Sequence, residues 1–272
     1  MIVDCHVHLF DPVRFPYTRH TIYTPASEES APLEALKAVM ADNGVDRAVL
    51  VGPVAGYNTD NRCLLAALRE DPDRFRGIAI VDPTVSDETL DAMEATGVVG
   101  ARFDLISLGT DYLLTIGSKL VARLIDRGWL IDIQCEGAQL AANRPLFRQA
   151  GRFVIDHGGR PSPSAGLDQP GFRALLDLAH ADGIWVKLSG PFRASRELVP
   201  YADMDPYFQA LVSTFGPSRL VWGSDWPFIR MNAKPDYSST LSCLARWLPS
   251  PADQKAVLCQ TPAALFRWGQ HE

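Results

Sequence analysis

Two histidines separated by a single residue close the first apolar segment of the chain. Residues 2–5 have the short apolar composition of a buried strand, and His6 and His8 follow at its end. Because successive side chains of a strand point to opposite faces, these two imidazoles are expected to point to the same side. Two imidazoles placed in this way could hold a metal ion or polarise a carbonyl group. The simpler interpretation is that they are two polar residues that close a strand.

A third imidazole and a carboxylate follow later apolar segments in the same manner. His157 ends the segment 152–157, and Asp225 ends the segment 219–225. A carboxylate that is shielded from bulk solvent and held by an imidazole can stay ionised and take a proton from water. Asp225 is therefore the candidate general base, although it could instead cap the next helix. His157 could likewise be a hydrogen-bonded core histidine.

Three arginines also stand at predicted strand ends. Arg102, Arg160 and Arg193 lie near the carboxyl ends of the fourth, sixth and seventh predicted strands. Arginine binds carboxylates through paired hydrogen bonds and keeps its charge. Three arginines at one rim therefore predict an anionic substrate. Each could instead pair with a structural acid such as Asp104 or Glu136.

The elements that would position these residues alternate between strand-like and helical segments. Such alternation indicates a parallel sheet covered by helices. Eight strands, each followed by helical sequence, favour a (β/α)8 TIM-type barrel or a distorted relative, in which the carboxyl ends of the strands meet at one mouth. A doubly wound open sheet is the alternative, but no Gly-x-Gly-x-x-Gly follows the first strand. The predicted strands are 2–5, 47–52, 76–82, 98–104, 129–135, 152–157, 184–189 and 219–225. The main predicted helices are 32–43, 116–127, 138–149 with an interruption at Pro145, 170–182, 204–215, 240–247 and 251–265.

The composition fits one barrel domain. With 272 residues, of which 47% are hydrophobic, the chain can bury the core of a fold that takes about 250 residues. No repeat, low-complexity segment or linker divides it, so residues 1–272 are predicted to form a single catalytic domain. The net charge of −6 argues against nucleic acid as a partner, and no apolar run approaches the roughly 20 residues that cross a membrane. We expect a monomer or a small homo-oligomer without nucleic-acid or membrane partners.

The cysteines and the N-terminus indicate a reducing compartment. The chain has five cysteines, an odd number, and they include no Cys-x-x-Cys pair. Such a set is more typical of reduced thiols than of disulfides or a zinc ribbon. The first residues enter a predicted strand directly, without a charged and then apolar leader. The expected location is therefore cytoplasmic.

Several of these residues fall within longer motifs that occur in the same order in a known family. By these motifs the chain resembles the amidohydrolase superfamily, and within it the group of lactone hydrolases typified by 2-pyrone-4,6-dicarboxylate lactonase. The likeness extends over nearly the whole chain. The matching motifs are Asp4-x-His6-x-His8, Phe15-Pro16-Tyr17, Tyr23-Thr24-Pro25, Asp60-Asn61, Arg102-Phe103, Asp156-His157-x-Gly159-Arg160-Pro161, Lys187-x-Ser189-x-Pro191-x-Arg193 and Trp222-Gly223-x-Asp225-Trp226-Pro227.

The resemblance implies a (β/α)8 barrel of the metal-dependent-hydrolase type that opens a lactone ring. It implies that Asp225 activates water, while His6, His8 and His157 contact the reacting carbonyl or orient the site. It also implies that the substrate is a small anionic lactone, such as 2-pyrone-4,6-dicarboxylate from aromatic catabolism. The residues implied to bind its carboxylates are Arg102, Arg160 and Arg193, with Tyr23 beside them.

The question of a metal ion turns on two positions. Metal-dependent members of the superfamily generally have lysine or glutamate at strand four and histidine at strand five, where this chain has Arg102 and Gln134. An arginine disfavours a nearby cation, and an amide is a weaker ligand than an imidazole. We therefore expect that no cofactor is required. The alternative is one divalent ion such as zinc, and its ligands would be His6, His8, His157 and Asp225.

Two departures from the lactonase group leave the substrate open. The group carries a further arginine shortly after the match to Arg102, where this chain has Leu108 or a neighbour, and a tyrosine near Gln134. Loss of one arginine weakens the recognition of a second carboxylate by about 1.5–3 kcal/mol. A muconolactone or a sugar lactone is therefore an alternative substrate. Two other functions are weighed against hydrolysis of a lactone: a zinc-dependent amidohydrolase or decarboxylase on the same barrel, and a non-catalytic protein that binds anions.

Overall fold

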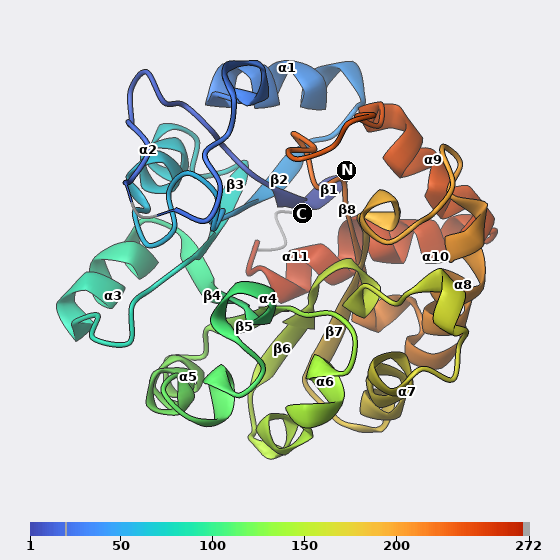
Figure 1. Cartoon of the computed structure of the whole chain (residues 1–272). Coiled ribbons are helices and arrows are strands. Elements are labelled where there is room, and N and C mark those ends of the chain that lie inside the picture. Colours follow the sequence, from blue (N-terminus) through green and yellow to red (C-terminus); the bar gives the residue numbers. More distant parts are fainter. Residues whose placement is uncertain (20, 269–272) are drawn as a thin grey trace.

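The eight predicted strands form one parallel sheet that is rolled into a barrel. The structure is a computed structural model and describes residues 1–19 and 21–268. The strands pair in chain order from β1 to β8, and helices surround them (Figure 1). The fold is thus the (β/α)8 TIM-type barrel that the sequence predicts. The strands are β1 (Val3–Val7), β2 (Arg47–Val51), β3 (Phe75–Ala79), β4 (Val98–Asp104), β5 (Leu130–Gln134), β6 (Arg152–Ile155), β7 (Ile184–Ser189) and β8 (Leu220–Gly223).

The barrel closes between its first and last strands. A parallel bridge joins Val7 to Trp226, and the backbone N–H of Asp225 donates to the carbonyl of His6 at 2.8 Å. The register shifts within the β1–β2 and β3–β4 pairs, so the barrel is not fully regular. Closure places His6, from the first strand, beside Asp225, which follows the last strand.

The helices cover the outside of the barrel. Ser86 caps α3 by accepting a hydrogen bond from the backbone N–H of Thr89 at 3.2 Å. The predicted helical segment 138–149 is interrupted near Pro145, since α6 stops at Ala142 and Pro145 belongs to the short 3-10 helix Arg144–Arg148. Among the described residues, no helix has the length and apolar character needed to span a membrane. The helices are α1 (Leu33–Asp42), α2 (Arg62–Glu70), α3 (Asp87–Ala95), α4 (Leu105–Leu108), α5 (Ser118–Asp126), α6 (Gln139–Ala142), α7 (Pro170–Asp177), α8 (Asp205–Phe215), α9 (Tyr237–Trp247), α10 (Pro251–Lys255) and α11 (Thr261–Leu265).

Two of the strands that end earlier than the hydrophobic pattern predicts are followed by candidate site residues. β6 stops at Ile155, and His157 lies in the following turn with φ 51°. β8 stops at Gly223, and Asp225 has φ 64°. Non-glycine residues with positive φ are uncommon, and they occur often at functional sites. The candidate third imidazole and the candidate base therefore stand on tight turns at the strand ends.

The interior of the barrel is apolar at one end and charged toward the other. A buried cluster that includes Val3, Leu130, Phe266 and Trp268 fills the amino-terminal end. Along β5, Asp132 follows Leu130 at a spacing of two residues and therefore points to the same face. The apolar cluster is therefore followed, nearer the carboxyl ends of the strands, by a layer of polar side chains.

Candidate active site

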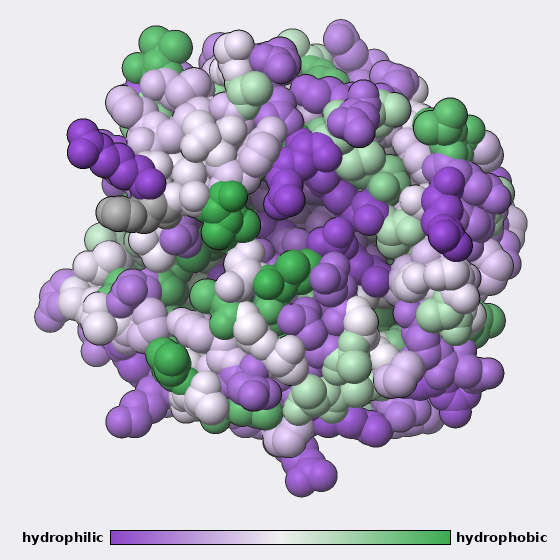
Figure 2. Space-filling view, in the orientation of Figure 1, coloured by the Kyte–Doolittle hydropathy of each residue, from purple (hydrophilic) through white to green (hydrophobic). Residues whose placement is uncertain are grey.

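A cavity of about 410 Å³ opens at the carboxyl ends of the strands. Figure 2 shows a hollow near the centre of this face, edged mostly by hydrophilic side chains. Polar residues from β4, β5 and the loops after β6, β7 and β8 reach it. Most of the predicted site residues line the cavity, namely His8, Arg102, His157, Arg160, Arg193 and Asp225.

The two histidines of β1 lie together, as their spacing predicts. His6 Nε2 and His8 Nε2 are 3.2 Å apart. His8 Nδ1 lies 2.8 Å from the carbonyl oxygen of Val51. A carbonyl can only accept, so His8 Nδ1 carries a proton and the Nε2 of neutral His8 offers a lone pair. A hydrogen on the Nε2 of one of the two rings can therefore bridge them.

Asp225 faces both of these imidazoles. Its Oδ1 lies 3.4 Å from His8 Nε2 and 3.7 Å from His6 Nε2, and its Oδ2 accepts a hydrogen bond from Arg193 Nε at 2.6 Å. The side chain is almost completely buried. Burial alone would raise the pKa of Asp225, but the charge of Arg193 and the adjacent histidines outweigh it and hold the pKa well below its usual range. Asp225 is therefore ionised at neutral pH.

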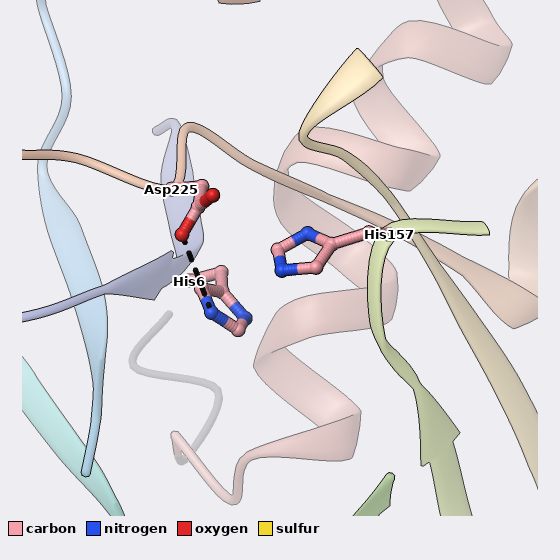
Figure 3. Close-up of side chains that lie close together, drawn as sticks. All are labelled: His6, His157 and Asp225. Carbon is pink, nitrogen blue, oxygen red and sulfur yellow. Dashed lines mark ion pairs between the residues drawn. The ribbon is translucent and has the colours of Figure 1, made fainter. Parts of the chain in front are cut away.

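The third imidazole completes this group from the opposite side of the barrel. Figure 3 shows His157, His6 and Asp225 facing one another. The His157 and His6 rings have centroids 4.7 Å apart, and His157 Nδ1 lies 2.9 Å from Ser189 Oγ. Burial lowers the pKa of His157 to about 4, so the ring is neutral at pH 7. Gly190 is required beside it, because a Cβ there would stand 2.8 Å from His157 Nδ1 and its φ is 55°.

A buried ionic network lies behind His6. Lys187 Nζ is 3.1 Å from His6 Nδ1 and 2.8 Å from Asp156 Oδ1, and it also contacts Asp132. All four side chains are fully buried. Burial by itself would lower the pKa of Lys187, but the two carboxylates outweigh it and raise the pKa, so the amine stays charged. The network fixes one edge of the His6 ring while its other edge faces His8 and Asp225.

Asp132 was missed as part of this site by sequence reasoning, and Asp156 and Lys187 were noted without a role. The available signal was a charged residue inside an apolar strand, as in Leu130–Gln134 and Ile184–Ser189. Burying a charge is costly unless it is paired, so such residues indicate partners across the barrel. The signal does not say which strand supplies the partner.

The three predicted arginines all reach the cavity, but they differ in their partners. Arg102 donates from Nε to Asp156 at 3.2 Å and also contacts Gln134. Arg193 donates to Asp225 and, from Nη1, to the carbonyl of Ile229 at 2.7 Å. The acid partners are thus not Asp104 or Glu136, which the sequence suggested. Within the described part of the chain, the guanidinium of Arg160 has no ion pair.

With this geometry in hand, known proteins identify the family. A model of the amidohydrolase family matches residues 3–268. The chain belongs to this family. This amidohydrolase is 33% identical to 4-sulfomuconolactone hydrolase of Rhizobium radiobacter, over 97% of this chain and 89% of that protein. It is 28% identical to 2-pyrone-4,6-dicarboxylate hydrolase of Comamonas testosteroni, over 97% and 89% of the two chains. The resemblance drawn from the motifs is confirmed, and these relatives are lactone hydrolases.

Solved structures share the whole fold of this amidohydrolase. A structure from Acinetobacter baumannii, designated a probable 2-pyrone-4,6-dicarboxylic acid hydrolase and containing citric acid, has a TM-score of 0.88 at 26% identity, covering 98% of this chain and 99% of that one. An amidohydrolase of Burkholderia multivorans with bound zinc has a TM-score of 0.78 at 22% identity and covers 98% and 99% of the two chains. The second likeness concerns the fold alone.

Two predicted site residues do not line the cavity of this amidohydrolase. His6 is fully buried beside His8, and the other is Tyr23. The Tyr23 hydroxyl donates to Glu29 Oε2 at 2.6 Å. Its ring packs against Arg230, whose guanidinium carbon lies 5.4 Å from the ring centroid. Arg230 does line the cavity, and no motif in the sequence singled it out. Tyr23 therefore meets a different arginine from the three that were expected beside it.

The donor set fits a single divalent ion. Ligand atoms of His6, His157 and Asp225 all lie within 4.8 Å of one another, and His8 Nε2 adjoins them. Three imidazoles and one carboxylate are ligands that zinc accepts. Against a cation stands Arg193, whose guanidinium already neutralises the same carboxylate. The site thus combines a metal-compatible donor set with an internal positive charge.

Proposed function

We propose that this amidohydrolase opens the ring of a small anionic lactone by adding water to its ester carbonyl. One observation carries the proposal: the ionised Asp225 carboxylate lies 3.4 Å from His8 Nε2 at a cavity that arginines also line. The names of the relatives, which are hydrolases of lactones, support it. The proposal treats residues 1–272 as a single catalytic domain, monomeric or in a small homo-oligomer and located in the cytoplasm.

Asp225 takes the role of general base. Its Oδ1 accepts a proton from water as the water oxygen bonds to the ester carbon, and the same proton later passes to the ring oxygen when its bond to that carbon breaks. The product is an open hydroxy acid. A strongly acidic carboxylate is a weak base, so the contact with Arg193 restrains Asp225 until a substrate binds. A substrate carboxylate that binds Arg193 would draw its charge away and make Asp225 more basic.

The histidines form the site of the carbonyl oxygen. His8 and His157 line the cavity and can meet that oxygen, whereas His6 is fully buried and contacts His8. Lys187 behind His6 adds a positive charge that favours the negative oxygen of the tetrahedral intermediate. Donors held in place before the reaction stabilise such an oxyanion without reorganisation. His157, held by Ser189, orients the third side of this pocket.

The substrate class follows from the charges of the cavity. Arginines from the ends of four segments line it, and arginine is suited to carboxylate recognition. The citric acid in the Acinetobacter structure and the names of the relatives agree with an anionic ligand. We propose a carboxylated lactone such as 2-pyrone-4,6-dicarboxylate, with a muconolactone or a sugar lactone as the alternative.

We propose that catalysis requires no metal ion, because Arg193 and Lys187 already supply positive charge to the site. The clustered donors nonetheless favour a second candidate, a zinc-dependent amidohydrolase or decarboxylase. If an ion is bound, His6, His8, His157 and Asp225 would hold it. It would supply a water of lowered pKa and polarise the substrate oxygen.

A panel of lactones separates these functions. Purified protein is analysed for metal content and then assayed by acid release, with and without a chelator, on pyrone dicarboxylate, muconolactones and sugar lactones. Ring opening that survives the chelator in metal-free protein is the expected result. Activity that is lost with the chelator and restored by zinc would establish the second candidate. Tight dicarboxylate binding without any turnover would instead indicate a protein that only binds anions.

A further inference from the structure

Four arginines line the cavity, and two of them are already committed to the barrel. Arg102 pairs with Asp156 at 3.1 Å, and Arg193 pairs with Asp225 at 2.6 Å. Each of these guanidiniums therefore has one buried carboxylate that neutralises it. Their remaining N–H groups can contact a substrate, but their charge is largely compensated before the substrate arrives.

The other two arginines are compensated less. Burial lowers the pKa of Arg160, whereas the nearby Glu136 carboxylate raises it, so this cation has an acid within range. Arg230 has no ion pair within residues 1–19 and 21–268. It is an exposed residue of the loop after β8 that still borders the cavity. Arg230 is thus the positive charge at the mouth with the least internal compensation.

The backbone of Arg230 is held while its guanidinium stays available. Its backbone N–H donates to Glu29 Oε1 at 2.7 Å, and φ is 62°. The other oxygen of Glu29 accepts from the Tyr23 hydroxyl at 2.6 Å and from the backbone N–H of Ala26 at 3.0 Å. Glu29 is therefore occupied by uncharged donors. The guanidinium carbon of Arg230 lies 5.4 Å from the centroid of the Tyr23 ring, a cation–π contact that pairs the charge with no carboxylate.

We propose that Arg230 is a specificity residue, and that it binds an anionic group on the part of the lactone farthest from the reacting ester. The proposal rests on the lactone hydrolysis proposed above and deepens it. The substrate is a lactone with a pendant oxyanion, carboxylate or sulfonate, that reaches the mouth of the cavity. Ile22 and Met231 border the same cavity as Arg230. Tyr23 and Glu29 position Arg230 and do not touch the substrate.

The test compares two forms of one substrate. The lactone of the panel that turns over fastest is assayed beside the analogue whose distal anion is replaced by a primary amide. Arg230→Met is expected to lower kcat/KM for the anionic form by about 10- to 100-fold, mainly through KM, because a charged hydrogen bond is lost. For the amide analogue we expect a change of less than about twofold. For the anionic form, the kcat/KM of Arg230→Lys should lie between the values of the wild type and Arg230→Met. Lysine keeps the positive charge but lacks the planar set of N–H donors.

Arg173→Met is the matched control, because Arg173 is an exposed arginine on α7 that pairs with Asp168 at 3.3 Å. Arg173→Met should leave kcat/KM unchanged for both forms of the substrate. Equal losses on both forms in Arg230→Met, or no loss on either, would overturn the proposal. If the wild type opens no lactone, the proposed function fails and calorimetry with citrate decides the role of Arg230. A Kd at least about tenfold weaker in Arg230→Met would then uphold it as an anion ligand, and an unchanged Kd would reject it.

Discussion

The floor of the cavity and its rim are built in opposite ways. On the floor, His6, Asp156 and Lys187 belong to strands or strand ends, are fully buried and contact one another within 3.1 Å. On the rim, Arg160 and Arg230 belong to loops and have no ion pair among the residues that the structure describes. One region holds its charges in a closed network of ion pairs, while the other has its charges at the wall of the cavity.

The floor carries groups proposed to act in catalysis, and the rim carries groups proposed to recognise the substrate. A buried charge without a partner is costly, so one residue of the floor cannot change unless its neighbours change with it. A rim arginine can be replaced with little effect on folding, and the loops of a barrel vary for this reason. The relatives are consistent with this division, because two proteins that resemble this chain over nearly its whole length are named for different lactones. Substitutions on the two regions should therefore have different effects.

The largest effect is expected at Asp225. Asp225→Asn keeps the shape of the side chain but removes the acceptor for the proton of water. We expect kcat to fall by about 100- to 10,000-fold, the range of a single general base. Affinity for a dicarboxylate inhibitor should stay the same or rise, because Arg193 loses its internal partner. Steady-state kinetics and calorimetry check both parts.

Asp104→Asn is the matched control for Asp225. Asp104 also lines the cavity, but its carboxylate caps α4 and accepts from Ile106 N–H at 3.1 Å and from Ser107 Oγ at 2.6 Å. This variant should retain most of its turnover. If Asp225→Asn stays within a few-fold of the wild type, or if both variants lose turnover equally, the role given to Asp225 is wrong.

The next effect concerns the buried network. Lys187→Met removes the only cation between Asp132 and His6 in the set of contacts described above. We expect the free energy of unfolding to fall by about 3–5 kcal/mol, as for buried ion pairs that lose one partner. Urea unfolding followed by circular dichroism measures this change. The double variant Lys187→Met with Asp132→Leu should recover part of the loss, and the network is unimportant if neither variant differs from the wild type.

Removal of Arg193 should shift the pH dependence of turnover. Burial raises the pKa of Asp225, and Arg193 contributes the largest opposing effect. In Arg193→Met the pKa of Asp225 therefore rises, the base becomes protonated at a higher pH, and the acid limb of the kcat profile moves to higher pH. Arg160→Met, which removes a cation that lines the same cavity without contacting Asp225, should weaken substrate binding with a smaller shift of that limb. Identical acid limbs in the wild type and Arg193→Met would contradict this account.

The sequence alone predicted that His6, His8 and Asp225 lie together. The period of two puts His6 and His8 on one side, and barrel closure brings Asp225 to them. It could not assign the partners, because His157 and Asp225 lie in turns with positive φ that the strand-like pattern of their segments does not predict. The pairing of Arg193 with Asp225 follows from such a turn. Local pattern predicts which residues stand at strand ends, and the turn decides what each side chain meets.

Of the rim, the sequence predicted Arg160 but not Arg230. The loop between β1 and α1 is long, and its conformation depends on a contact between Glu29 and the backbone of Arg230 at the other end of the chain. No local pattern encodes such a contact. The motif containing Tyr23 was visible, but its neighbour Arg230 was not, so the tyrosine was expected beside the wrong arginines. Loops specified by long-range contacts carry little signal in any short window of sequence.

The smallest effect is expected at Tyr23, which positions Arg230 and does not contact the substrate. Tyr23→Phe removes the hydroxyl that donates to Glu29 at 2.6 Å but keeps the ring under Arg230. Because one ordinary hydrogen bond is worth about 0.5–1.5 kcal/mol, KM for the anionic lactone should rise by less than about tenfold, with kcat unchanged. Tyr23→Leu also removes the aromatic face, so its KM should rise further. A loss of kcat in Tyr23→Phe would mean that Tyr23 acts on the floor, and the division between the two regions would not hold.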